Sequence, residues 1–192
     1  MAQLSSLSPK LIWHFFEQIC SIPHPSKHEA QLSAWIVAWA QGEGLAVKQD
    51  AVGNIIIKKP ATPGMENRKA VVLQAHIDMV PQANADTQHD FTQDPIDAYI
   101  DGEWVTARGT TLGADNGMGM AGCLAVLADK TIKHGPRGGS SNTGGRTPVR
   151  LDLIRVARRG RQGPSGDRKD VEGDKRLDPP LGLWTFLHDL LA

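Results

Sequence analysis

The stretch that decides the fold is Val71-Val72-Leu73-Gln74-Ala75-His76-Ile77-Asp78-Met79. Its nearly continuous apolar run over 71–75 predicts a strand in the middle of a covered sheet. Because strand side chains alternate, His76 and Asp78 are expected to point to the same side. A neutral imidazole nitrogen binds zinc, and a nearby carboxylate can accept the other ring N–H and orient the ring. The stretch therefore indicates a metal site at the end of a strand.

A second motif is Gly109-Thr110-Thr111-Leu112-Gly113-Ala114-Asp115-Asn116-Gly117. It predicts a glycine-rich turn that delivers Asp115 just ahead of a helix. The two oxygens of this carboxylate can bridge two metal ions roughly 3.5–4 Å apart, as in two-metal hydrolases. Two simpler interpretations stay open: Asp115 can instead cap the helix, and a single His-x-Asp is a weak signal. The two motifs together favour a metal-hydrolase site.

The other expected elements give an α/β class. Helices are expected from Pro9 to Ile19, from Ser26 to the glycines at 42 and 44, and from Asn116 onward, with strands over 45–50, 54–58 and 102–107. Ser8 is a plausible N-cap for the first helix. The spacing of Ser26 and Glu29 predicts a capping box for the second.

Two further groups resemble metal ligands and are interpreted as structural. His24 lies between two prolines, which favours an extended loop histidine. The segment 82–101 is interpreted as a surface loop because its spacing repeats no ligand pattern, although it contains His89, Asp90, Asp94, Asp97 and Asp101.

Composition limits the function classes. The 192 residues contain 21 Lys+Arg and 21 Asp+Glu, so net charge gives no reason to expect a nucleic-acid partner. Cys20 and Cys123 are interpreted as reduced core residues rather than a disulfide framework. No signal peptide or apolar run of roughly 18 residues is found, which predicts a cytoplasmic protein without a membrane segment.

Residues 1–136 resemble the N-terminal part of the aminoacyl-histidine dipeptidases, a family of cytosolic zinc metallopeptidases. The matching stretches are Leu7-Ser8-Pro9, Ile19 to Ser26, Asp50 to Ile55, Gly64 to Asn67, Gln74 to Pro81 and Arg108 to Gly119. The resemblance implies a zinc-peptidase-like sheet with helices packed on it, two zinc ions and dipeptide substrates, Xaa-His among them. By motif position it implies that His76 is a zinc ligand, Asp78 the catalytic carboxylate that orients the site, and Asp115 the bridging ligand.

The chain changes character at Arg137. Residues 137–192 contain 11 Lys+Arg against 7 Asp+Glu and many glycines and prolines, which predicts a largely disordered, non-homologous tail. The family pattern would continue with an apolar strand and a Glu-Glu pair, a general base and a zinc ligand, where this chain has Gly144-Gly145-Arg146. We hypothesise a frameshift, because dropping one base from a permitted coding of 137–143 restores an apolar segment.

The sequence thus predicts a metal-dependent dipeptidase by resemblance, in a truncated chain that is expected to be inactive. The alternative is a non-catalytic interaction protein whose basic Arg/Gly tail binds RNA or acidic partners. Interleaved acids and the lack of stacking aromatics argue against that alternative. Oligomeric state is not predicted.

Overall fold

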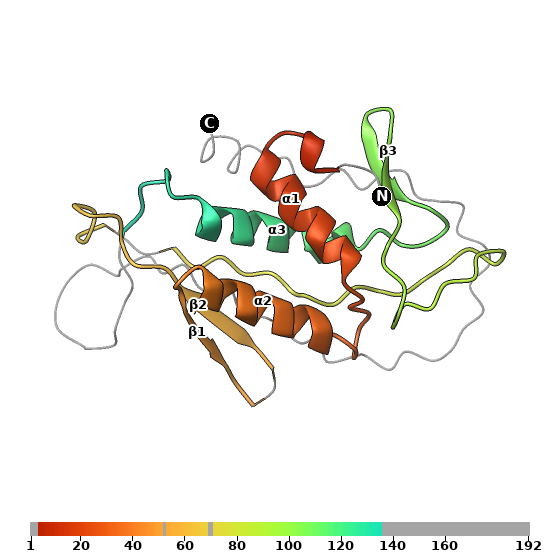
Figure 1. Cartoon of the computed structure of the whole chain (residues 1–192), viewed down its shortest axis with the longest axis horizontal. Coiled ribbons are helices and arrows are strands. Elements are labelled where there is room, and N and C mark those ends of the chain that lie inside the picture. The colour runs from red at the N-terminus through yellow and green to blue at the C-terminus, as the bar shows by residue number, and fades with distance from the viewer. Residues whose placement is uncertain (1–3, 52, 69–70, 136–192) are drawn as a thin grey trace. The chain divides into compact units, whose positions relative to one another are not determined.

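The computed structural model describes residues 4–51, 53–68 and 71–135. The predicted boundary at 136/137 and the predicted disorder of 137–192 lie outside these residues. In chain order the described elements are η1 (Leu4–Ser6), α1 (Lys10–Ser21), α2 (Ala30–Gly42), β1 (Ala46–Gln49), β2 (Ile55–Lys58), β3 (Ala98–Asp101), β4 (Trp104–Ala107) and α3 (Ala114–Ala128) (Figure 1). This mixture of helices and strands agrees with the predicted α/β class.

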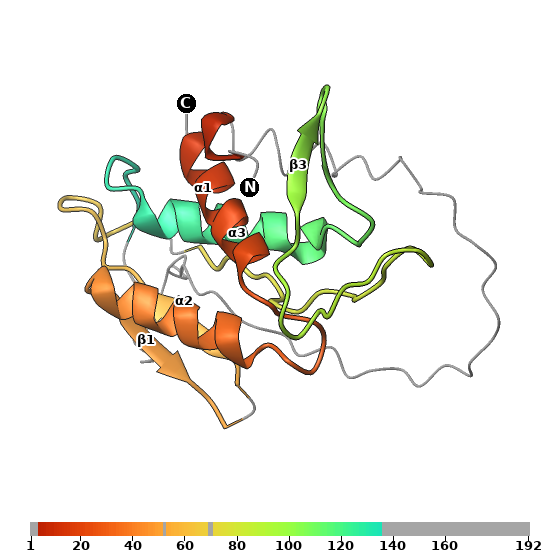
Figure 2. The same cartoon turned by 45° about the vertical axis from the view of Figure 1, so that its right-hand side comes forward.

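Helices α1 and α3 pack directly against each other, as Figures 1 and 2 show. The spacing of Leu11, Ile12, Phe15, Phe16 and Ile19 in the sequence predicts one buried face on α1. The structure buries Ile12, Phe15, Phe16, Ile19 and also Cys20, but Leu11 is 37% exposed, so the prediction is wrong for Leu11. The helices come close at Gly117, where an added Cβ would lie 3.1 Å from Cε2 of Phe16. The glycine therefore permits the close packing that holds the start of α3 in place.

Helix α2 packs on a hairpin formed by β1 and β2, which pair antiparallel with Ala46 opposite Lys58. Trp35 and Trp39 of α2 both meet Phe15 edge-on, with ring centroids 6.5 and 5.2 Å away. Their spacing of four residues in the sequence predicts that both tryptophans pack along one side of the helix, and these ring contacts agree with it, since edge-to-face pairs stabilise a core beyond their buried area. Strands β1 and β2 fall within the predicted strands over 45–50 and 54–58.

A second antiparallel hairpin joins β3 and β4, with Ala98 opposite Ala107. Strand β4 falls within the predicted strand over 102–107. Strand β3 lies in the segment 82–101 that was predicted to be a surface loop, so that prediction is wrong over 98–101. The guanidinium of Arg108 lies 4.1 Å from the ring centroid of Tyr99, and this contact braces the hairpin.

The predicted central strand over 71–75 is the main correction. In the described part of the chain the strands form two separate two-stranded sheets, and 71–75 belongs to neither. Val71 and Val72 are 45% and 49% exposed, whereas Ala75, Ile77 and Met79 are buried. An apolar run predicts burial, but a strand also needs a neighbour to pair with. Within 71–75 the structure assigns a single β-bridge residue, Gln74, and no continuous ladder; the next bridge along the segment joins Met79 to Pro25.

Both predicted serine caps are also wrong. Helix α1 begins at Lys10 with Pro9 at the N-cap, and α2 begins at Ala30 with Glu29 at the N-cap; neither residue makes a side-chain capping hydrogen bond to its helix. The hydroxyl of Ser26 is used instead in a contact with Asp78. Ser26 therefore has the spacing of a capping box but makes a different contact.

Cys20 and Cys123 are free and buried, as predicted. Burial raises the pKa of each thiol to about 12, because a thiolate loses its hydration in the core. Among the helices that the structure describes, none is long and apolar enough to cross a membrane.

Candidate metal centre

Backbone pairing brings the two predicted motifs together. The amide of Thr111 donates to the carbonyl of Gln82 (2.8 Å), and its hydroxyl donates to the carbonyl of Val80 (2.7 Å). An isolated antiparallel bridge joins Ala83 to Thr110. The glycine-rich turn is thus held directly beside the segment that follows His76 and Asp78.

Alternation along 75–79 orients the first motif. Ala75, Ile77 and Met79 are buried, while the side chains of His76 and Asp78 are 18% and 12% exposed. The same-side placement expected from the sequence is therefore confirmed, although the segment is not part of a regular strand.

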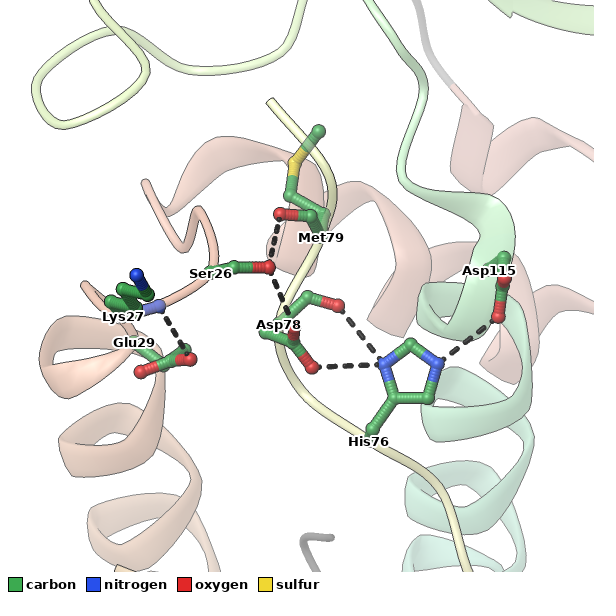
Figure 3. Close-up of polar contacts among 7 residues, drawn as sticks. All are labelled: Ser26, Lys27, Glu29, His76, Asp78, Met79 and Asp115. Carbon is green, nitrogen blue, oxygen red and sulfur yellow. Dashed lines mark hydrogen bonds and ion pairs between the residues drawn. The ribbon is translucent and has the colours of Figure 1, made fainter. Parts of the chain in front are cut away.

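The imidazole of His76 lies between two carboxylates (Figure 3). Its Nδ1 lies 3.1 Å from Oδ1 of Asp78 and 3.1 Å from the Asp78 carbonyl oxygen. Both partners are acceptors, so a proton on Nδ1 is donated to Asp78. In that tautomer Nε2 keeps its lone pair, the arrangement typical of metal-binding histidines.

Asp115 supplies the other carboxylate, with Oδ1 3.1 Å from Nε2 of His76. Its backbone (φ −93°, ψ 99°) is not helical, so it stands ahead of the regular turns of α3. Gly113 before it has φ +75°, and an added Cβ would lie 3.2 Å from Sδ of Met79. In the part of the chain that the structure describes, the Asp115 carboxylate contacts His76 and caps no backbone N–H.

This pair of atoms fits a cation. In the tautomer with the proton on Nδ1, the lone pair of Nε2 and the carboxylate oxygen of Asp115 are two acceptors facing each other, which is favourable when a positive charge lies between them. Two ligands of one tetrahedral zinc ion at ~2.0–2.1 Å lie about 3.3 Å apart, close to the observed separation. Within the described residues no group of three or more His, Cys, Asp or Glu side chains forms a complete metal site. His76 and Asp115 therefore provide two donors.

His24 lies near this site but faces the protein interior. It is 3% exposed, and its Nδ1 donates to the carbonyl of Ile22 at 2.5 Å. Burial lowers its pKa, against the opposing effects of the Ile22 carbonyl and the charges of Asp78 and Glu29. A hydrogen-bonded histidine of this kind agrees with the interpretation of His24 as structural.

The acids of 82–101 make local contacts away from His76. Asp90 accepts hydrogen bonds from the amide and hydroxyl of Thr92, which lower its pKa. Asp97 pairs with Arg108 at 3.2 Å. These contacts are typical of a solvated surface segment rather than of a metal site.

Sequence reasoning missed the part that Ser26 plays at this site. Its hydroxyl donates to Oδ2 of Asp78 at 2.6 Å, although 52 residues separate the two. The available signal was the rigid Pro23-His24-Pro25-Ser26 turn, but the capping-box spacing of Ser26 predicted a helix cap instead.

No family model matches the sequence. The chain is 68% identical over 136 residues to the cytosol non-specific dipeptidase of Escherichia coli, which covers 71% of this chain and 28% of that protein. A solved aminoacylhistidine dipeptidase from Vibrio alginolyticus matches 83% of this chain and 30% of its own, with 60% identity and a TM-score of 0.73.

A tripeptidase from Staphylococcus aureus shares the fold over 76% of this chain and 35% of its own, with 19% identity and a TM-score of 0.55. The chain thus spans less than a third of the two more similar proteins. Over its matched part, this chain is similar in sequence to the aminoacylhistidine and cytosol non-specific dipeptidases and has the fold of the corresponding part of the solved Vibrio alginolyticus protein.

Proposed function

We propose that His76, Asp78 and Asp115 belong to the metal site of a metal-dependent dipeptidase. The observation that carries the proposal is the His76 ring, held through Nδ1 by Asp78 with Nε2 3.1 Å from Oδ1 of Asp115. The names of the two more similar relatives support dipeptides as the substrate class. The name of the curated relative also supports a cytosolic location.

Each residue has a separate task. Asp78 would accept a hydrogen bond from Nδ1–H and so keep Nε2 unprotonated, Nε2 would be one ligand atom, and the exposed carboxylate of Asp115 would hold the metal as a second, bridging ligand. Zinc, when bound, lowers the pKa of its water to about 7 and polarises the peptide carbonyl. Zinc is proposed over other metals because imidazole and carboxylate are among its usual ligands.

We expect the 192-residue chain itself to hydrolyse dipeptides negligibly. Its described residues supply two donors and an orienting carboxylate, whereas a catalytic zinc site uses three protein ligands. A proton acceptor for the attacking water is also needed. Turnover of an Xaa-His dipeptide by the zinc-loaded chain, lost in His76→Ala, would overturn this expectation.

A chimaera tests the function. The 136 matched residues replace the corresponding segment of the Escherichia coli dipeptidase. We expect metal-dependent dipeptide hydrolysis that is lost in His76→Ala and kept in His14→Ala, a histidine exposed on α1. A folded chimaera without activity, or one still active as His76→Ala, contradicts the proposal. No described contact favours the alternative of a tail that binds RNA, and the relatives reported above are peptidases.

A further inference from the structure

We propose that Ser26 is a positioning residue for this site: its hydroxyl locks the Asp78 carboxylate in the orientation that fixes the tautomer of His76. The proposal deepens the function proposed above and rests on it. Ser26 and Asp78 lie side by side in Figure 3, on segments far apart in the sequence.

The geometry of the contact indicates a charge-assisted hydrogen bond. The distance from Oγ of Ser26 to Oδ2 of Asp78 is 2.6 Å, within the range of O–H donors to carboxylates. The same hydroxyl lies 3.1 Å from the Met79 carbonyl oxygen, a longer contact to a neutral acceptor. One hydroxyl has one proton, so the carboxylate is its principal acceptor.

The two oxygens of Asp78 are divided between two donors. Oδ2 accepts from Ser26, and Oδ1 accepts from Nδ1 of His76 at 3.1 Å. The carboxylate can rotate about its bond to Cβ only by giving up one of them. Ser26 therefore holds Oδ1 in line with the ring, and through it the ring itself.

The backbone gives Ser26 a fixed position. Its amide donates to the Met79 carbonyl at 2.9 Å, and the Met79 amide donates to the His24 carbonyl at 3.3 Å. Pro25 pairs with Met79 as a parallel bridge. The flanking prolines restrict His24 to extended conformations, so the turn reaches this position with little freedom.

A competing contact makes the lock necessary. Asp115 presents a carboxylate oxygen to Nε2 at 3.1 Å, the same distance at which Asp78 faces Nδ1. The ring proton therefore has an acceptor at either nitrogen, and on Nε2 it would block the ligand atom. The hydrogen bond from Ser26 favours the Nδ1–H tautomer by keeping Asp78 aligned.

The test compares four forms of the full chain: wild type, Ser26→Ala, Ser26→Thr and Ser21→Ala. Threonine keeps the hydroxyl. Ser21→Ala is a matched control, because that hydroxyl donates within its own helix end to the Gln18 carbonyl at 2.6 Å. The first readout is the side-chain ¹⁵N NMR spectrum of the metal-free chain at about pH 8, where an unperturbed imidazole is neutral. His76→Ala assigns the His76 signals by removing them.

We expect Nδ1–H in the wild type, Ser26→Thr and Ser21→Ala, and a large Nε2–H fraction in Ser26→Ala. The second readout is zinc affinity by calorimetry. It should fall about 3- to 10-fold in Ser26→Ala alone, less than the loss typical of residues that contact a ligand directly. An unchanged tautomer in Ser26→Ala would overturn the proposal.

The two proposals fail in different ways. Zinc binding that is absent, or indifferent to His76→Ala, contradicts the metal site, while the tautomer of the metal-free chain still decides the role of Ser26. Zinc binding that depends on His76 but leaves the Ser26→Ala tautomer and affinity at wild-type values contradicts the role of Ser26 alone.

Discussion

His76 owes its proposed role to its neighbours, because an isolated imidazole exchanges its proton between both nitrogens. Asp78→Asn tests the contribution of one neighbour, the Asp78 carboxylate that faces Nδ1 of His76. The amide keeps the shape but can present an N–H to Nδ1, which favours the opposite tautomer. We expect zinc affinity to fall about 10- to 100-fold by calorimetry. Asp97→Asn, which breaks an exposed ion pair with Arg108, should leave the zinc affinity unchanged. Equal losses of zinc affinity in both variants would argue against orientation of His76 through Asp78.

His24 predicts a pH dependence of stability. Burial lowers its pKa in the folded chain, so the unfolded chain binds the proton more readily below about pH 6.5. The free energy of unfolding should therefore decrease as pH falls from about 6.5 to 5, a window above the usual carboxyl range. Urea unfolding should show a shallower pH dependence in His24→Gln. The same pH dependence in both proteins would contradict this origin.

The sequence predicts residues of the candidate site only where short motifs place metal-binding side chain types close together along the chain. His76, Asp78 and Asp115 stand out because a metal site needs imidazole and carboxylate groups at the ends of elements. Ser26 does not, because its partner is 52 residues away and its spacing to Glu29 matches a common helix start. A long-range hydrogen bond leaves no periodic signal.

At the scale of elements, the start of α3 depends on Gly113. Its φ of +75° is in the left-handed region, and an added Cβ would lie 3.2 Å from Sδ of Met79. Gly44 has φ +70° with nothing within 4 Å of the same Cβ, so Gly44→Ala isolates the backbone cost. That cost is about 1–2 kcal/mol. In urea unfolding, Gly113→Ala should lose about 1 kcal/mol more stability than Gly44→Ala, because the added methyl group crowds Met79. Equal losses of stability in the two variants would mean that Gly113 matters only for its backbone conformation.

The elements that could be predicted are those determined locally. Helices α1, α2 and α3 and strands β1, β2 and β4 follow from apolar spacing and turn residues within each segment. The run over 71–75 failed as a strand because pairing depends on a distant neighbour. Strand β3 was missed because its four residues, Ala98 to Asp101, are a short run at the end of the acid-rich segment 82–101, which as a whole resembles a loop.

At the scale of the whole molecule, the matched part and the tail differ in kind. The sequence match to the Escherichia coli dipeptidase covers 136 residues, 71% of this chain, whereas residues from Arg137 onward are rich in arginine and glycine. The frameshift hypothesis predicts that the DNA across codons 130–150 has an alternative frame encoding an apolar strand followed by glutamates. Sequencing the gene checks this. If neither alternative frame encodes such a segment, the hypothesis is wrong.

The central claim is that His76 and Asp115 bind one metal ion. Zinc titration calorimetry on the full chain, His76→Ala, Asp115→Ala and the double variant tests it most directly. We predict weak binding to the full chain, a loss of about tenfold or more in each single variant, and no further loss in the double variant, because two donors to one ion are not independent. Single variants that bind zinc as the full chain does, or losses that simply add, would contradict the claim.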